Sequence, residues 1–178
     1  MDMSVIDCSA ARALAQKAVP DGLMVDPERF TETQQGWYFP YSPNPDLIGS
    51  NGVIVHKNTG RAFVLGSAFP VERDIRAYDE GFQFHSYDLV ILEIMNWQKT
   101  VATLLAIGPT VVTPEYAHGT VWRIPRHLSQ QDIEARLAKL PVVFPDVGLY
   151  FRVEVLQEAR DRGYCRFEAI GRSQRRPG

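Results

Sequence analysis

The residues best suited to chemistry in this chain are its four histidines, His56, His85, His118 and His127. None of them belongs to a helical His-Glu-x-x-His pattern, and none lies near a cysteine, so the spacing predicts no metal site. Glu115 and His118 are three residues apart, but no third ligand is close to them in the sequence. We therefore interpret this pair as a polar loop before a strand that starts at Gly119.

The two cysteines, Cys8 and Cys165, lie near opposite ends of the chain and lack a metal-like spacing. A disulfide would form only if the fold brought them together, and two reduced thiols in a cytosolic protein are the favoured interpretation. Cys165 lies in an alternating strand pattern, which is typical of a buried, inert thiol. An enzyme that uses Cys165 or His118 is the less supported alternative.

Other catalytic patterns are also missing from the sequence. The segment Gly49-Ser50-Asn51-Gly52 is too short for a phosphate-binding loop, is not followed by Lys-Ser or Lys-Thr, and opens no helix. Gly-x-Ser-x-Gly does not occur. Asp79 and Glu80 are adjacent, and adjacent residues on a helix do not face each other, so they form a poor acid–base pair. We therefore expect a non-enzymatic protein without a cofactor.

Composition and charge set the class of the protein. The 178 residues are 45% apolar and 22% charged, which suits one domain or two small ones. Residues 1–90 carry 7 basic and 12 acidic residues, 7 − 12 = −5, whereas residues 91–178 carry 12 and 9, 12 − 9 = +3. The acidic half fits a basic partner and disfavours nucleic acid, and a solvated acidic surface is the alternative. With no apolar run near the roughly 20 residues of a membrane helix and no secretory pattern, we expect a cytoplasmic protein outside the membrane.

The first half must position any site with a helix, three strands and a second helix. Ala11, Leu14, Ala15 and Ala18 form one helical face, capped by Ser9. An aromatic strand over residues 36–41 follows, then a Pro-rich loop over residues 42–51. A hairpin with strands 53–56 and 61–65 turns at residues 57–60, and a helix covers residues 70–78. Val53, Val55, Phe63 and Leu65 are expected on the core-facing side of the hairpin.

The second half has weaker patterns. We expect a strand or helix start at residues 89–92, an ambiguous segment at 97–107, and strand pieces at 111–112 and 119–124. Ser129 and Asp132 predict a helix start with a capping box, residues 149–162 predict a helix, and residues 164–170 a last strand. The chain should be α+β, an antiparallel sheet with packed helices, in two small units at 1–82 and 83–170 with a frayed basic tail at 171–178.

The candidates for contact with a partner lie in the first half. We expect Trp37 in the core and Tyr38, on the opposite strand face, at the surface, because Trp and Tyr dominate interface hot spots. The loop over residues 43–50 with Asp46, and the acidic end of the following helix, are the other candidates. The predicted partner-binding residues are Tyr38, Asp46, Asp74, Asp79 and Glu80.

The ordered residues of this half are similar to those of a known family. Gly36-Trp37-x-Phe39-x-Tyr41 is followed by Gly49-x-Asn51-Gly52-x-Ile54-Val55, by Thr59-Gly60 and Gly66-Ser67, and by Pro70-x-Glu72 and Tyr78. With the leading Ala-rich helix, this series resembles the immunity protein 35 family, also called YrhB-like, over about the first half of the chain. Val53 replaces the family's usual proline and His56 its usual acidic residue. The pattern residues to which we assign structural roles are Gly36, Trp37, Asn51, Gly52, Thr59, Gly60, Pro70 and Glu72.

The resemblance implies a small bacterial α+β immunity protein, encoded beside a polymorphic toxin, that protects the producing cell by binding the toxin. The partner would be the cognate toxin, with no nucleic acid and no membrane involved. A chaperone-like or other cytosolic protein-binding module is the alternative. The second half of the chain is not covered by the resemblance.

Overall fold

The computed structural model describes residues 5–19, 21–43 and 51–172, and it has an α+β fold. The chain divides into two compact units, unit 1 (Met1–Gln83) and unit 2 (Phe84–Gly178), where we expected a division after residue 82. None of the helices in the described ranges is long and apolar enough to span a membrane.

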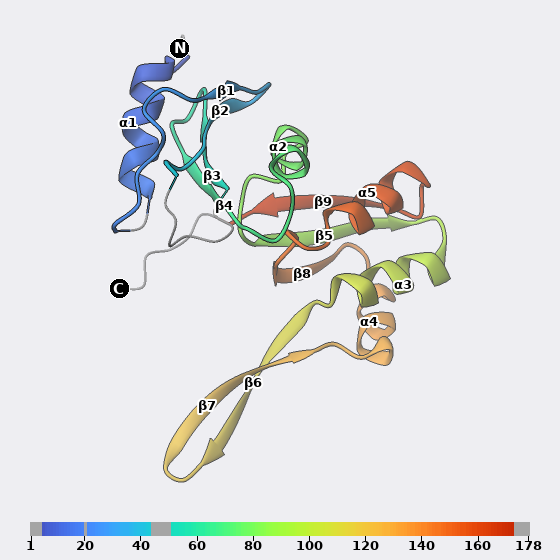
Figure 1. Ribbon diagram of the computed structural model, residues 1–178. Coiled ribbons are helices and arrows are strands. Elements are labelled where there is room, and N and C mark those ends of the chain that lie inside the picture. Colours follow the sequence, from blue (N-terminus) through green and yellow to red (C-terminus); the bar gives the residue numbers. More distant parts are fainter. Residues whose placement is uncertain (1–4, 20, 44–50, 173–178) are drawn as a thin grey trace. The chain divides into compact units, whose positions relative to one another are not determined.

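The described residues of unit 1 form two helices and a four-stranded antiparallel sheet in the order β1-β2-β3-β4 (Figure 1). Its elements are α1 (Cys8–Ala18), β1 (Thr31–Glu32), β2 (Gly36–Phe39), β3 (Gly52–His56), β4 (Ala62–Leu65) and α2 (Val71–Asp79). The aromatic strand ends at Phe39 rather than at Tyr41, which forms an isolated bridge with Val25. Helix α1 is capped by Asp7, not by Ser9: the Asp7 carboxylate accepts the N–H of Ala10 at 2.8 Å.

The sheet of unit 1 is buried on both faces. Toward α1, Val53 and Val55 of β3 pack with Phe39, Ala11 and Ala15. Toward α2, the buried side chains are Tyr38, Ile54, Phe63, Leu65 and Tyr78. Our expectation of a single core-facing side was therefore wrong, because the Val53–Val55 pair and the Phe63–Leu65 pair point to opposite faces.

Two glycines, Gly36 and Gly52, allow strands β2 and β3 to approach closely. A Cβ at Gly36 would lie 2.7 Å from Cγ2 of Ile54 and 2.8 Å from the carbonyl oxygen of Val55. Gly52 has a φ of 125°, and a Cβ there would fall against the carbonyl oxygen of Phe39. Only glycine fits both positions without a shift of the backbone.

Between residues 84 and 172, unit 2 forms a three-stranded antiparallel sheet in the order β8-β5-β9, a separate two-stranded sheet and three helices. Its elements are β5 (Tyr87–Ile94), α3 (Trp97–Ile107), β6 (Thr110–Ala117), β7 (Thr120–His127), α4 (Gln130–Leu137), β8 (Val142–Val147), α5 (Val153–Asp161) and β9 (Cys165–Gly171). Helix α3 packs against α4 and α5, and α5 packs against β9. Alternate side chains of β5 (Tyr87, Leu89 and Ile91) are buried, because every second residue of a strand points to the same face of the sheet.

Several expectations for unit 2 are resolved by the structure. The ambiguous segment 97–107 is helical, because Asn96 caps it through the N–H of Lys99 and Gly108 ends it with a φ of 73°. The capping box of Ser129 and Asp132 is present. Helix α5 begins at Val153, four residues later than expected, and β9 begins at Cys165.

We expect Gly52→Ala to destabilise unit 1 more than Gly81→Ala. Gly81 has a φ of 101° and nothing within 4 Å of a Cβ, so its substitution carries only backbone strain, about 1–3 kcal/mol. At Gly52 the clash with main-chain atoms adds to a similar strain. Urea unfolding, followed by the NMR amide signals of β3 and β4, measures the free energy of unfolding of unit 1 in each variant. Equal decreases in this free energy in the two variants would contradict this account.

Candidate protein-binding surface

Polar groups of residues to which we assigned structural roles from the sequence stabilise turns and strand ends of unit 1. Asn51 donates from Nδ2 to the carbonyl oxygen of Phe69 at 2.7 Å. Trp37 is partly buried against the α1 side of the core, and its indole N–H donates to the carbonyl oxygen of Ile6 at 2.9 Å. These contacts join segments that are distant in the sequence, so both side chains have structural roles.

The remaining pattern residues lie at element boundaries. The hydroxyl of Thr59 accepts the N–H of Arg61 at 3.4 Å, and Gly60 has a φ of 68° in the β3–β4 turn. Pro70 precedes α2, and its carbonyl accepts the N–H of Arg73 at 3.1 Å. Glu72 is exposed in the first turn of α2, where its charge suits the helix dipole.

Tyr38 is not a surface residue, contrary to our expectation. Its side chain packs under α2 and is only 9% exposed, and its hydroxyl donates to the carbonyl oxygen of Asn51. Burial raises the pKa of Tyr38, which keeps the hydroxyl protonated as a donor. The strand face that we assigned to solvent is covered by α2, and this covering explains the error.

The expected acidic helix end is largely internal to unit 1. Asp74 is 3% exposed and forms an ion pair with Arg73 at 3.1 Å, so it is not part of an exposed acidic surface. Asp79 accepts three hydrogen bonds from the turn between β1 and β2: from the hydroxyl of Thr33 at 2.9 Å and from the N–H groups of Gln34 at 3.1 Å and Gln35 at 2.9 Å. Glu80 is exposed. Asp46 and most of its loop lie outside the described residues.

His56 stabilises the β3–β4 turn through one of its ring nitrogens. Its Nδ1 accepts the N–H of Asn58 at 3.1 Å and of Thr59 at 3.3 Å, so this nitrogen carries no proton. A carboxylate would accept the same two N–H groups. Partial burial, and then the charge of Arg61, lower the pKa of His56.

The described residues offer little support for the chemical sites that we considered. No group of three or more His, Cys, Asp or Glu side chains that could hold a metal ion occurs in residues 5–19, 21–43 and 51–172. Cys8 and Cys165 are free thiols that belong to different units. Burial raises the pKa of Cys165, with a smaller opposing effect from its hydrogen bond with Thr100, which lowers its thiolate fraction at neutral pH.

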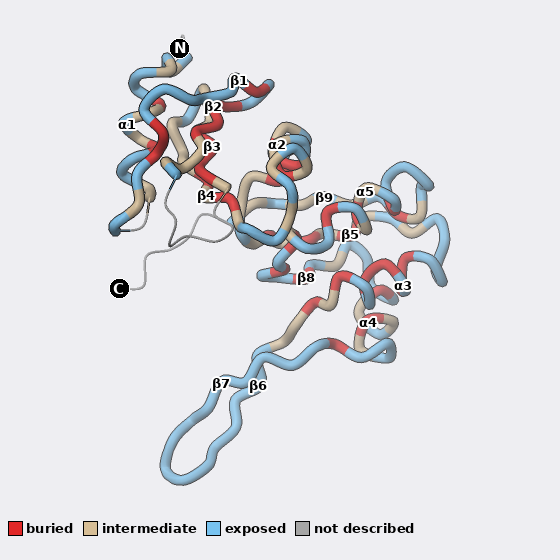
Figure 2. Tube along the Cα trace, in the orientation of Figure 1, coloured by how far each residue is buried: buried red, intermediate tan, exposed pale blue. Residues whose placement is uncertain are grey.

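Five exposed apolar side chains of the described residues gather on the hairpin of β6 and β7 (residues 110–127, the β6–β7 hairpin). It extends away from the helices of unit 2 (Figure 1), and all of β7 and β6 from Val112 onward are exposed (Figure 2). Its large apolar side chains, Val112, Tyr116, Val121, Trp122 and Ile124, are 44–76% exposed. These side chains add nothing to the core of unit 2, and clusters of this kind mark interaction sites.

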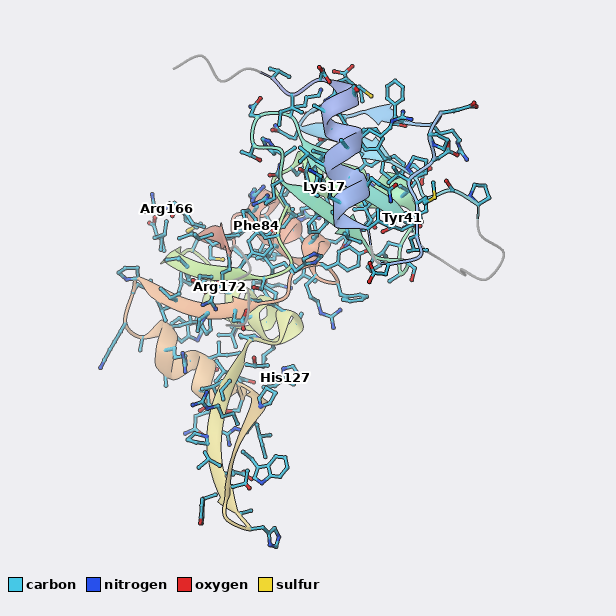
Figure 3. All side chains as sticks on the ribbon, turned by 90° about the vertical axis from the view of Figure 1, so that its left-hand side faces the viewer. Lys17, Tyr41, Phe84, His127, Arg166 and Arg172 are labelled. Atoms are coloured by element: carbon cyan, nitrogen blue, oxygen red, sulfur yellow. The ribbon has the colours of Figure 1, made fainter. Side chains whose placement is uncertain are left out.

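The base and the tip of the β6–β7 hairpin have well-defined geometry. His127 lies where the hairpin joins the rest of unit 2 (Figure 3), and its Nδ1 is 2.9 Å from the carbonyl oxygen of Gly108 at the end of α3. The next residue, Leu128, is buried and donates its N–H to Pro109 at 2.9 Å. At the tip, His118 and Gly119 have φ values of 51° and 77°, the positive angles of a type I′ turn.

Our sequence interpretation missed this surface, although a signal for it was present. His118-Gly119 separates two segments of strand-forming residues by two residues, which is a hairpin pattern. We interpreted the flanking strands as separate pieces and looked for a partner surface in the acidic half.

The chain was also compared with known proteins. No family model, no curated protein and no solved structure matches it.

We expect Asp79→Ala to destabilise unit 1 by about 2–3 kcal/mol, since three hydrogen bonds from the β1–β2 turn to a charged group are lost. Asp79→Asn keeps one acceptor oxygen and should cost less. Urea unfolding followed by the amide signals of β1 and β2 measures both variants. Stability equal to that of the wild type in Asp79→Ala would show that these hydrogen bonds do not hold α2 to the turn.

We expect unit 1 to lose stability as the pH falls below about 6.5, the ordinary pKa of histidine in an unfolded chain. Because the folded pKa of His56 is lower, the unfolded state binds its proton first, and stability decreases until the pH passes the folded pKa. His56→Asp should keep the turn and flatten this dependence between pH 7.5 and about 5.5, because aspartate titrates near about 4. Unfolding of both forms across this range, followed at β3 and β4, checks the sign; an equal slope in both would contradict it.

Proposed function

We propose that this chain is a bacterial immunity protein, a non-enzymatic antitoxin that binds a cognate toxin and occludes its active site or substrate groove. One observation carries the proposal: the β6–β7 hairpin exposes Tyr116, Trp122 and Arg123 outside any core. Tyr, Trp and Arg are the residue types that contribute most binding energy at protein interfaces. The hairpin thus has the composition of a protein-binding surface.

The family resemblance supports the same proposal from unit 1. Its pattern residues account for the close strand approach at Gly36 and Gly52 and for the contacts of Trp37 and Asn51. These are roles in a scaffold, as expected for a protein that acts by binding. In this proposal the protein works in the cytoplasm of the producing cell, where the toxin would otherwise act.

A chaperone-like module is the second candidate, favoured by apolar side chains on both faces of the β6–β7 hairpin. Surfaces that accept varied clients use flexible, Met-rich segments. The hairpin contains no methionine and has two prolines and a type I′ turn, so we favour one defined partner.

We expect co-expression of this chain to protect cells from the toxin encoded beside its gene, and the purified pair to form a stoichiometric complex. An unrelated toxin serves as the control and should kill with or without this chain. If no neighbouring toxin is neutralised, the proposed function is wrong. Suppression of aggregation of several unrelated unfolded proteins, without one tight partner, would support the chaperone-like module instead.

A further inference from the structure

We infer that the β6–β7 hairpin inserts into a cleft of the toxin whose two apolar walls enclose both faces of the hairpin, with a carboxylate opposite Arg123. The inference rests on the proposed function, because it specifies how the same partner is bound. Four features of the hairpin lead to it: the side chains on its two faces, its blocked edges, its dimensions and its charge.

The register of the hairpin places large side chains on both faces. Opposite residues share a face, and the pairs Tyr116–Val121 and Glu115–Trp122 are consecutive, so Tyr116 and Trp122 project to opposite sides. Figure 3 shows side chains leaving the ribbon on both sides. The proline face carries Val112, Pro114, Tyr116, Val121, Arg123 and Pro125, and the tryptophan face carries Val111, Glu115, Trp122, Ile124 and Arg126. A flat partner would cover one face only, whereas a cleft covers both.

The edges of the hairpin are unsuited to pairing with another strand. Proline has no N–H, so Pro114 and Pro125 occupy the pairs whose backbone groups point away from the neighbouring strand. A strand added along β6 would find no donor at Pro114, and one added along β7 would find none at Pro125. Prolines at such positions protect an edge against β-augmentation. The two prolines therefore favour contact through side chains over pairing with an added strand.

The dimensions of the hairpin define the size of the cleft. Each strand has eight residues, which at about 3.4 Å per residue gives a length of about 27 Å. Layers pack at about 10 Å from a sheet, so the two walls would lie about 20 Å apart, measured between their backbones. The proposed groove is therefore about 27 Å long and about 20 Å wide.

Charge indicates the polar group that the cleft should present. Arg123 makes no ion pair with any residue of the described ranges, and it lies on the proline face between Val121 and Pro125. Arg126, in contrast, lies near Asp132, whose pKa is lowered by hydrogen bonds with Ser129 and further by the charge of Arg126. A buried guanidinium needs an anionic partner, and a carboxylate matches it in two hydrogen bonds.

The small net charge also favours a protein over a nucleic acid. Residues 110–127 carry two arginines, Arg123 and Arg126, and one glutamate, Glu115, which gives 2 − 1 = +1 with neutral histidines. Binding to a phosphate backbone uses many more cationic contacts, about 6–10 in typical complexes. The exposed aromatic and aliphatic groups of the hairpin instead match an apolar protein cleft.

The test measures the affinity of the full chain for a catalytically inactivated form of the neighbouring toxin. Tyr116→Ser and Trp122→Ser each remove the large group of one face, and both should weaken binding about 10-fold or more, mainly through faster dissociation. Arg123→Glu should weaken binding more than Arg123→Ala, because it places two carboxylates together. Circular dichroism checks that each variant keeps its fold, which is expected because all three side chains are exposed.

Matched variants elsewhere on unit 2 are the controls. Phe151 is 57% exposed, close to the 55% of Trp122, and Phe151→Ser should leave the affinity unchanged. Arg162 is exposed outside the hairpin, and Arg162→Glu repeats the charge change of Arg123→Glu. Pro114→Thr restores an outward N–H on β6 at a position of the proline face. Unchanged or weaker binding in this variant supports contact through the faces, whereas tighter binding would indicate β-augmentation and overturn the inference.

The outcomes separate this inference from the proposed function. Suppose that the wild type binds the toxin and that Tyr116→Ser and Trp122→Ser bind it with the same affinity. The inference is then wrong and the proposed function stands. Loss in only one of them indicates docking by a single face and also overturns insertion. If the wild type does not bind the toxin, both proposals fail. Sedimentation of the free chain completes the test, because a dimer that dissociates in Trp122→Ser would assign the hairpin to a second copy.

Discussion

Unit 1 depends on the burial of β3, because this strand is covered on both faces. Val53 and Val55 point to α1 and Ile54 points to α2, and all three have 0% exposure. Each such aliphatic side chain contributes about 1.5–3 kcal/mol when fully buried. The glycines at 36 and 52 permit the close packing of β2 beside β3, since a Cβ at either position would fall against main-chain or side-chain atoms of the neighbouring strand.

This double coverage explains which parts of unit 1 could be predicted. The hairpin of β3 and β4 and the helix after Pro70 follow from local turn residues and from helical spacing. The position of Tyr38 does not, because strand alternation separates two faces without indicating whether the second is exposed. The role of Asp79 also escapes a local pattern, since its hydrogen-bond donors lie 44–46 residues earlier in the sequence.

In unit 2 the sequence pattern leads to the opposite error, because side chains that it suggests are buried are in fact exposed. Apolar residues in a strand pattern are usually assigned to a core, and Val121, Trp122 and Ile124 fit that rule. The structure leaves them exposed, since the type I′ turn at His118-Gly119 pairs β7 only with β6 and no other strand or helix covers either face among the described residues. Local turn chemistry thus predicts the hairpin, but only tertiary structure reveals its exposure.

The acidic excess of the first half is therefore weak evidence for a basic partner. Several of its carboxylates have internal partners: Asp7 caps α1, Asp26 accepts the N–H groups of Glu28 and Arg29, and Glu32 pairs with Lys57. Asp74 and Asp79 are also engaged within unit 1. Charges that stabilise turns and helix ends contribute to the net charge, but they are held by their own chain. Because these carboxylates already have partners, we expect contact at the apolar and aromatic side chains of unit 2 rather than at an acidic patch on unit 1. Binding through such side chains would depend on shape and desolvation more than on long-range attraction.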